Sequence, residues 1–304
     1  MGAHQPGDVG PIGGQALIEG VMMRRGTCWG AAVRRLDGSI ATTTRVLPAR
    51  LAPWRRPPLV RGVVALGESV AVGTAALLWA ARERGDDDHR PPTRAGLAVS
   101  FVVAIVLAVG LFGLAPAAAA KLLGLRRSLS FNAVEGAVRL SLLVAYLGLL
   151  SRSREIRRTF AYHGAEHMTI HAFEHRRPLV ADEIERFDRR HPRCGTSFLM
   201  LVVLTSVAVH ALIGTPSWPV LVASRILLLP VVAGIAYEAI RLAGRHQDSW
   251  YARVLAAPGT WLQTITTRQP DDDQMEVAVA ALHATLAAEE LGSADGPTTE
   301  AALA

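Results

Sequence analysis

The chain has 304 residues, half of them apolar, with a mean hydropathy of +0.27 and a formal net charge of +6. The charge comes from arginine, since Lys121 is the only lysine, and the arginines flank long apolar blocks, as they do in membrane proteins. This arrangement argues against nucleic-acid binding, and no zinc-finger or helix-turn-helix spacing is present. The two cysteines, Cys28 and Cys194, provide no disulfide framework, and reduced thiols in a cytoplasmic setting are the simpler interpretation.

The N-terminal part of the chain is polar. Residues 1–12 are rich in glycine and proline, lack a secretory signal, and are predicted to be disordered. Residues 13–61 are predicted to form a cytoplasmic module that contains a β-hairpin. Its turn is Asp37-Gly38, because Asp-Gly favours the positive φ values of a type I′ turn, and its strands are 32–36 and 39–46.

Five apolar blocks follow, at residues 62–81, 95–120, 131–150, 197–214 and 219–243. A transmembrane helix needs about 20 apolar residues to cross ~30 Å of hydrocarbon. The last four blocks meet this requirement within the error of their boundaries. The first block is weaker, because it contains Glu68 and Ser69 and is rich in glycine and alanine.

Charge decides between four and five membrane crossings. The segment 151–196 contains ten arginines, so the positive-inside rule places it in the cytoplasm. The arginine-rich N-terminal module and the end of the last block, at Arg241 and Arg245, belong on the same side. Four spans satisfy these clusters if residues 62–81 form an interfacial or re-entrant helix. Residues 95–150 and 197–243 are then the two transmembrane helix pairs, and both termini are cytoplasmic.

The C-terminal part, residues 244–290, is predicted to be a cytoplasmic segment that ends in a helix. Three aspartates at 271–273 precede the helical stretch Met275–Glu290, and acidic side chains favour a helix N-terminus. Residues 291–304 are predicted to be a disordered tail. The fold class is therefore mainly α: a polytopic helical membrane protein with about four transmembrane helices, an interfacial or re-entrant helix and a small cytoplasmic α+β part.

The segment 151–196 also contains the pattern H-x-x-E-H, at His163, Glu166 and His167. On a helix the two histidines are one turn apart on the same side, so that their imidazoles can share one metal ion. Glu166 is placed to take a proton from a metal-bound water. The stretch 154–174 has no proline and one glycine, which favours a helix. The alternative interpretation is a charged, solvated helix beside the membrane.

A catalytic zinc ion usually has three protein ligands, so a third residue is required. Glu174 shares the helical face but lies roughly 10 Å along the axis from His167, and His171 is similarly distant from His163. His191 and Cys194 are better candidates, because they directly precede the fourth apolar block at the same membrane face. Further candidates are Glu19 and Glu238. The alternatives are that Cys194 is a small buried residue and His191 an ordinary loop residue.

Some ionisable residues lie inside the apolar blocks. Glu135 and Arg139 are four residues apart and are predicted to pair, while His210 and Arg225 lie nearer the outer side. Such residues can line a transport pathway, but pairing between helices is the simpler interpretation. A transporter should also have discontinuous helices, for which Pro230 and Gly234 are the only indication.

Several longer motifs resemble those of the YqhQ family of uncharacterised bacterial membrane proteins, which are described as predicted metal-dependent enzymes. The matching motifs are Gly13–Arg24, Tyr162–His167, Arg193–Phe198, Tyr237-Glu238, Pro258–Gln263, Thr266–Arg268 and Glu276–Ala278. The resemblance extends from Gly13 to about Leu282. It implies a bacterial membrane protein with a metal site. The chain departs from the family at Met168, where lysine is usual, and His171 is not part of the family pattern.

The sequence leaves two main hypotheses for the function of the chain, and transport is a third and weaker one. The first is a metal-dependent hydrolase at the cytoplasmic face of the bacterial cell membrane, acting on a lipid-linked or membrane-tethered substrate. In this hypothesis His163 and His167, with His191 or Cys194, bind a divalent ion such as zinc, and Glu166 is catalytic. The second is a non-catalytic membrane scaffold, for which changes at Gly164 or Gly195 should disrupt folding while Glu166→Gln leaves the function intact.

Overall fold

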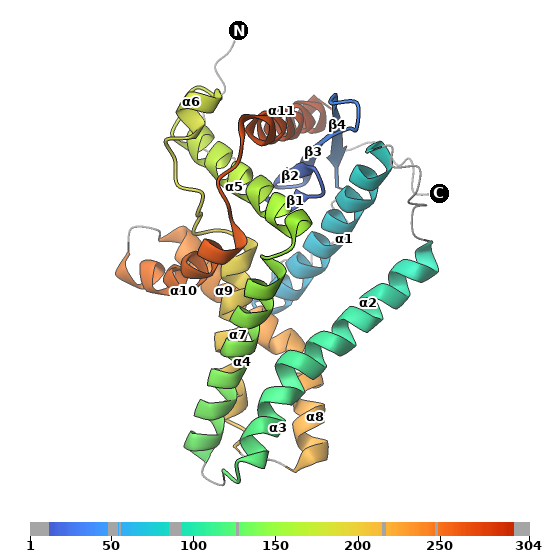
Figure 1. The fold of residues 1–304 in the computed structure, drawn as a ribbon. Coiled ribbons are helices and arrows are strands. Elements are labelled where there is room, and N and C mark those ends of the chain that lie inside the picture. Colours follow the sequence, from blue (N-terminus) through green and yellow to red (C-terminus); the bar gives the residue numbers. More distant parts are fainter. Residues whose placement is uncertain are drawn as a thin grey trace.

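The computed structural model describes residues 12–47, 54, 56–84, 93–125, 128–214, 217–246 and 249–294 (Figure 1). The strands are β1 (Gly13–Leu17), β2 (Gly20–Arg25), β3 (Cys28–Arg34) and β4 (Ile40–Val46). The helices are α1 (Val60–Glu83), α2 (Arg94–Ala108), the π-helix η2 (Val109–Leu114), α3 (Ala115–Leu122), α4 (Ser128–Leu150), α5 (Arg154–Glu174), α6 (Ala181–Ile184), α7 (Gly195–Ala211), α8 (Trp218–Leu227), α9 (Leu229–Arg245), α10 (Trp250–Thr266) and α11 (Asp272–Ala294). The chain is mainly helical, as predicted.

The N-terminal module contains more than the predicted hairpin, because all four strands form one antiparallel sheet in the order β1-β2-β3-β4. The hairpin of β3 and β4 is confirmed, but the type I′ turn is wrong. Gly38 has a φ of +85°, whereas Asp37 is not among the described residues with positive φ. The Arg35 N–H instead bonds the Ser39 carbonyl at 2.8 Å, which closes a longer loop. Of residues 1–12 and 291–304, predicted to be disordered, 1–11 and 295–304 lie outside the described residues. The prediction is wrong at Ile12, which is buried in the core, and at residues 291–294, where α11 continues to Ala294.

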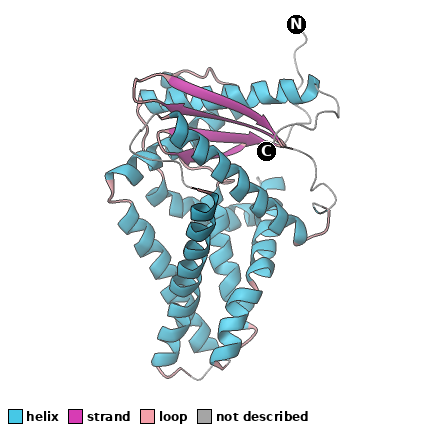
Figure 2. Cartoon of the chain, turned by 90° about the vertical axis from the view of Figure 1, so that its right-hand side faces the viewer, coloured by secondary structure: helices cyan, strands magenta, loops and turns pink. Residues whose placement is uncertain are grey.

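Both faces of the sheet are covered by helices (Figures 1 and 2). Side chains alternate along β2, so that Val21 and Met23 pack with α5 and α11, while Met22 packs with α1. The first core includes Tyr162 and Met168 of α5 together with a run of apolar residues on α11. One face of the sheet is therefore covered by both α5, which carries the histidines, and α11 from the C-terminal part of the chain, and the other face is covered by α1.

The apolar helices extend away from this α/β body (Figure 2). Three helical segments among the described residues are long and apolar enough to cross a membrane, namely Val60–Glu83, Ala95–Leu122 and Leu129–Leu150. The pair α8 and α9, bent by 47°, makes a fourth if it is one span, and α7 is a shorter apolar helix of 17 residues. Lys121 at the end of α3 lies 4.6 Å from the Trp218 ring at the start of α8, so these turns lie at one end of the helices.

Helix α1 has the length of a span, yet one side of it belongs to the α/β body. Val72, Ala76 and Ala80 pack against the sheet, and Glu68 forms an ion pair with Arg24 of β2 at 3.0 Å. Glu68, the charged residue that made this block a poor candidate for a transmembrane helix, is thus paired with a residue of the sheet. By length and composition α1 is nevertheless a candidate span, whereas α7, which the sequence predicted to be one, is shorter.

The predicted pair in the third apolar block is confirmed and is part of a larger network. Glu135 of α4 bonds both Arg139, at 2.5 Å, and Arg225 of α8, at 2.5 Å, and all three side chains are buried. Arg139 also donates to the Phe112 carbonyl of η2 at 2.7 Å. His210 of α7 contacts the Ser224 carbonyl of α8 at 3.4 Å through Nε2. The ionisable residues therefore connect four apolar segments, which is the pairing interpretation.

The two C-terminal helices complete the body around the site. Helix α11 begins as predicted at the aspartates: the Asp271 carboxylate accepts the Gln274 N–H at 2.9 Å, and the Gln274 side chain accepts the Asp271 N–H at 3.1 Å. Helix α10 was not predicted, and it packs closely on α7. A Cβ at Gly259 would overlap the backbone of Ser197, so glycine is required at this contact.

Candidate metal centre

The helix α5 carries the H-x-x-E-H pattern and is held by packing on two sides. Tyr162, Ala165 and Met168 pack against the sheet and α11, which leaves the histidines on another face of the helix. Gly164 lies directly under the segment that follows α10, where the Arg268 N–H donates to the Phe160 carbonyl at 2.9 Å. The position of this segment matters because Thr266, just before it, contacts one of the histidines.

Alanine at position 164 is expected to destabilise the protein by about 1–3 kcal/mol, the usual cost of overpacking. The new methyl group would overlap the carbonyl oxygen of Arg268. Gly195→Ala is the control, because no atom lies within 4 Å of the added Cβ there. Thermal unfolding of the purified protein in detergent measures both. Equal losses of stability at positions 164 and 195 would contradict the open space around Gly195. Such a result would instead match the scaffold hypothesis, which predicts that changes at either glycine disrupt folding.

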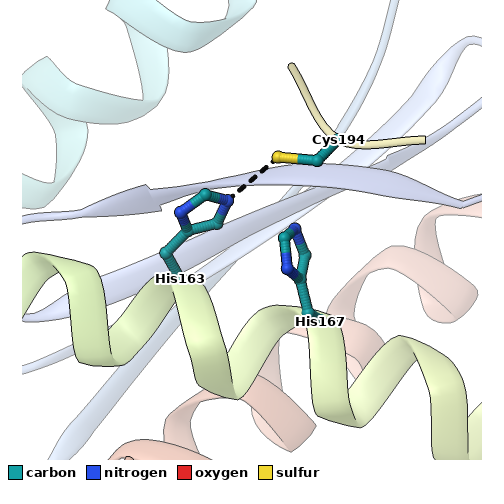
Figure 3. Close-up of side chains that lie close together, drawn as sticks. All are labelled: His163, His167 and Cys194. Carbon is teal, nitrogen blue, oxygen red and sulfur yellow. Dashed lines mark hydrogen bonds between the residues drawn. The ribbon is translucent and has the colours of Figure 1, made fainter. Parts of the chain in front are cut away.

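Three of the four predicted ligands converge. His163, His167 and Cys194 each offer a ligand atom within 4.8 Å of the other two, and Figure 3 shows both rings and the sulfur facing one point. The His163 Nε2 and the Cys194 Sγ are 3.1 Å apart, and the two ring centroids are 4.4 Å apart. Helix spacing sets the two imidazoles one turn apart, and the thiol arrives from the loop before α7.

Backbone carbonyls set the tautomers of the two imidazoles. The His163 Nδ1 lies 2.8 Å from the Thr266 carbonyl oxygen, and the His167 Nδ1 lies 2.7 Å from the Arg189 carbonyl oxygen. A carbonyl accepts a hydrogen bond, so each Nδ1 carries the proton and each Nε2 keeps its lone pair. This is the arrangement that outer-shell groups impose on metal-binding histidines. Burial also lowers the pKa of His167, which keeps that ring neutral.

The third donor, Cys194, is the N-cap residue of α7. Its sulfur accepts from the Thr196 N–H at 3.4 Å and from the Thr196 hydroxyl at 3.2 Å. Burial opposes ionisation of the thiol, but His167 and the bonds from Thr196 hold the pKa of Cys194 below its ordinary value. A helix N-terminus also favours a negative charge. The sulfur is therefore prepared to act as a thiolate, the form that binds metals.

The carboxyl group of Glu166 lies beside these donors in a closed environment. The residue is 3% exposed, and its Oε2 has no hydrogen-bond partner among the described residues. Gly14 of β1 gives it room, since a Cβ there would lie 2.9 Å from the Glu166 Oε1. Burial raises the pKa of Glu166 to about 8, although the nearby His163 opposes the shift.

Replacing Glu166 by glutamine is expected to change how stability depends on pH in metal-free protein. The folded-state pKa of about 8 lies above the reference value of 4.5. The proton on Glu166 therefore stabilises the folded state fully below a pH of 4.5. This stabilisation is lost as the pH rises through about 8, by at most about 1.4 kcal/mol per pH unit.

Glu166→Gln should therefore unfold like the wild type at a pH of about 5, and at a higher temperature than the wild type at a pH of about 8.5. Chelator-treated protein should be used for both. The exposed Glu155→Gln, on the first turn of the same helix, is the control. Parallel unfolding curves for Glu166→Gln and the wild type across this range would contradict the buried, protonated carboxyl.

The loop that presents Cys194 is held by Gln263 of α10, a residue that the sequence analysis did not single out. Its side-chain oxygen accepts the His191 N–H at 2.7 Å, and its Nε2 donates to the His191 carbonyl at 2.9 Å and to the Ser197 hydroxyl at 3.2 Å. Gln263 is fully buried. It fixes the peptide three residues before the thiol, and its place in the Pro258–Gln263 motif was the only sequence signal for it.

The fourth predicted ligand, His191, lies in a neighbouring cluster with His171 and Glu174. Its Nε2 lies 3.7 Å from the Glu174 carboxylate, which also bonds Arg193. The His191 Nδ1 accepts from the Arg193 N–H at 3.2 Å, so the proton of this ring is on Nε2, opposite to the two rings above. Although burial opposes it, His191 and Arg193 hold the pKa of Glu174 below its ordinary value.

The two other candidate ligands are engaged elsewhere. Glu19, in the turn between β1 and β2, bonds Arg158 at 2.5 Å and accepts from the Tyr162 hydroxyl at 3.3 Å. Glu238 of α9 bonds Arg61 of α1. Neither belongs to a described group of possible metal ligands. Their role in the structure is to dock the sheet on α5 and α1 on α9.

Together these features define a mainly helical protein with three or four apolar helices of membrane-spanning length, a four-stranded α/β body, and a buried cluster of two histidines and one cysteine. The chain belongs to the family described as "Protein of unknown function (DUF1385)", whose model matches residues 57–288. It is 34% identical over 299 residues to the "Uncharacterized protein YqhQ" of Bacillus subtilis (strain 168), covering 92% of this chain and 93% of that protein. The resemblance to the YqhQ family is thereby confirmed. No solved structure matches the chain.

Proposed function

We propose that the chain is a metal-dependent enzyme of the bacterial cell membrane, a hydrolase, with His163, His167 and Cys194 as metal ligands and Glu166 as catalytic base. The observation that carries the proposal is the convergence of these three donors beside the buried Glu166, whose Oε2 has no hydrogen-bond partner among the described residues. Two imidazoles and a thiolate are a donor set that suits zinc and leaves a fourth position open. His191 is assigned to the support of the loop.

The residues divide the chemistry between them. His163 and His167 donate through Nε2, with the Thr266 and Arg189 carbonyls holding the rings. When bound, a divalent cation supplies a Lewis acid at the open position. Glu166 accepts a proton from the attacking water and returns it to the leaving group. The unpartnered Oε2 and the raised pKa of Glu166 support this role, because buried groups with perturbed pKa values cluster at functional sites.

We place the site at the cytoplasmic face of a multi-pass protein with both termini inside. Cys194 directly precedes α7, and the two histidines converge on it, so the ligands lie at the end of an apolar helix. Helix α10 exposes Trp250 and Trp261, at 72% and 51%, as interfacial helices do. A substrate that is lipid-linked or otherwise tethered to the membrane fits this position. Membrane lipid is the expected surrounding partner, and no role in nucleic-acid binding is proposed.

Two other functions have specific features in their favour. The docking contacts of Glu19 and Gln263 would serve a scaffold equally well. The 47° bend between α8 and α9, beside the buried Glu135 and Arg225, is the kind of interruption that transporters use. Neither alternative accounts for two rings with matching tautomers around one thiol.

Metal analysis of the purified protein tests the proposal. The wild type is expected to contain close to one zinc ion per chain, while His163→Ala and His167→Ala contain almost none. His175→Ala is the matched control. This histidine is the C-cap residue of the same helix, and its Nδ1 bonds the His171 carbonyl. Equal and negligible metal in the wild type and in both variants would end the proposal.

A further inference from the structure

A second polar cavity lies apart from the histidine cluster, between β2, α1 and α9. It has a volume of about 320 Å³, and its polar lining is Arg24, Arg61, Glu68, Ser69, Tyr237 and Arg241. The helices α1 and α9 touch closely beside it, since a Cβ at Gly62 would lie 2.7 Å from that of Tyr237. The cavity thus sits where the docked helix α1 meets both the sheet and an apolar helix.

Positive charge exceeds negative charge around this cavity. Arg24 is paired with Glu68 at 3.0 Å, and Arg61 is paired with Glu238 through Nε at 2.6 Å. The third arginine, Arg241, has a buried Nη1 without a hydrogen-bond partner in the described part of the chain. Three guanidinium groups therefore face two carboxylates. This excess of one positive charge makes the site suited to an anion.

The cavity also offers neutral donors and an apolar approach. The hydroxyls of Ser69 and Tyr237 line it together with the arginines, and guanidinium with hydroxyl is the donor set that binds phosphate. On the outer side of α1, Leu66 and Val70 flank Ser69 and are 38% and 45% exposed. A phosphate in the cavity could therefore be attached to acyl chains that lie along α1. Basic pockets beside apolar helices recognise lipid headgroups in this manner.

We propose that this cavity binds a phosphate group, carried by the headgroup of an anionic membrane lipid, with Arg241 as its principal ligand. The lipid would hold α1 against α9 and the sheet. A choline headgroup brings a positive charge of its own beside the arginines and is therefore disfavoured, so the preference is for a lipid such as phosphatidylglycerol. This site is independent of the metal centre, and His163→Ala should leave it unchanged.

The test is a titration of full-length protein in neutral detergent with phosphatidylglycerol, with phosphatidylcholine of equal chain length, and with inorganic phosphate. The rise in unfolding temperature is followed in each case. Phosphatidylglycerol is expected to stabilise the wild type at concentrations about tenfold lower than the other two, which corresponds to one charge-assisted hydrogen bond. Equal effects of the two lipids, or equal protection by inorganic phosphate, would overturn the lipid assignment.

Substitutions in the lining test whether the lipid binds in this cavity. Arg241→Gln is expected to abolish the preference, and the exposed Arg245→Gln, one turn further along α9, to retain it. Ser69→Asp places a negative charge in the cavity at an exposed position, where folding should tolerate it, and should also abolish the preference. A preference for phosphatidylglycerol that survives both Arg241→Gln and Ser69→Asp would refute the proposed site.

Discussion

Protein in which Cys194 is replaced by serine is expected to bind zinc at least about 100-fold more weakly than the wild type. A serine hydroxyl does not ionise near neutral pH, so the anionic ligand is lost while the shape of the side chain is kept. The hydrogen bonds from Thr196 and the position of Cys194 as the N-cap of α7 can be retained by the hydroxyl, so the fold should survive. Competition with a chromophoric chelator measures the affinity.

Cobalt substitution makes this prediction specific. Wild-type protein loaded with Co²⁺ should show the charge-transfer absorption of a thiolate bound to the metal, and Cys194→Ser should lack it. Cys28→Ser is the matched control, because Cys28 is the other cysteine of the chain and lies buried in β3. An unchanged spectrum in Cys194→Ser, or its loss in Cys28→Ser, would remove the sulfur from the proposed ligand set.

Glu135→Gln is expected to lower the free energy of unfolding by about 3–5 kcal/mol. The carboxylate bonds Arg139 and Arg225, both at 2.5 Å, and the amide would leave two buried guanidinium groups without a counter-charge. Denaturation of the detergent-solubilised protein should show the loss as a shift in midpoint. The exposed Glu155→Gln on α5 should change stability little.

A double variant provides the internal check. In the wild type, two arginines and one carboxylate give this cluster a net charge of +1; Glu135→Gln raises it to +2, and adding Arg225→Met returns it to +1. The double variant should therefore be more stable than Glu135→Gln alone. If it is less stable, the attraction between Glu135 and its arginines is not what holds these helices together.

Local signals predicted several elements well. The aspartates at 271–273 marked the start of α11, and the absence of proline between 154 and 174 marked α5. Apolar blocks located the long helices, because burial in lipid or protein requires continuous apolar stretches. The turn at Asp37-Gly38 was located correctly but given the wrong type, because only the glycine adopts a positive φ.

Long-range packing could not be read from the residues. The strand β1 begins with glycines, which have poor strand propensity. A Cβ at Gly14 would overlap the Met22 carbonyl oxygen of β2 and would also lie 2.9 Å from the Glu166 Oε1, and the second is a contact between distant segments. Helix α10 was missed because Pro258-Gly259 normally ends a helix, whereas here the glycine allows contact with Ser197. Packing against α7 outweighs the local preference.

The site itself was half predictable. Helical spacing alone placed His163 and His167 together, and proximity to the fourth apolar block correctly brought Cys194 to them. The same reasoning could not separate His191 from Cys194, since the two lie three residues apart on one loop. The distinction depends on contacts that exist only in the folded chain, where Cys194 lies with His163 and His167 while His191 lies with His171 and Glu174.

The contact between α11 and the sheet has a consequence for how the chain is made. The Thr285 hydroxyl of α11 bonds the Met23 carbonyl of β2, across 262 residues of sequence. At a synthesis rate of about 5–20 residues per second, the ribosome needs roughly 13–50 s to deliver the second partner after the first. Throughout that interval Val21, Met23 and Ala32 lack the part of their cover that α11 supplies, so the first core is completed only after α11 has been made.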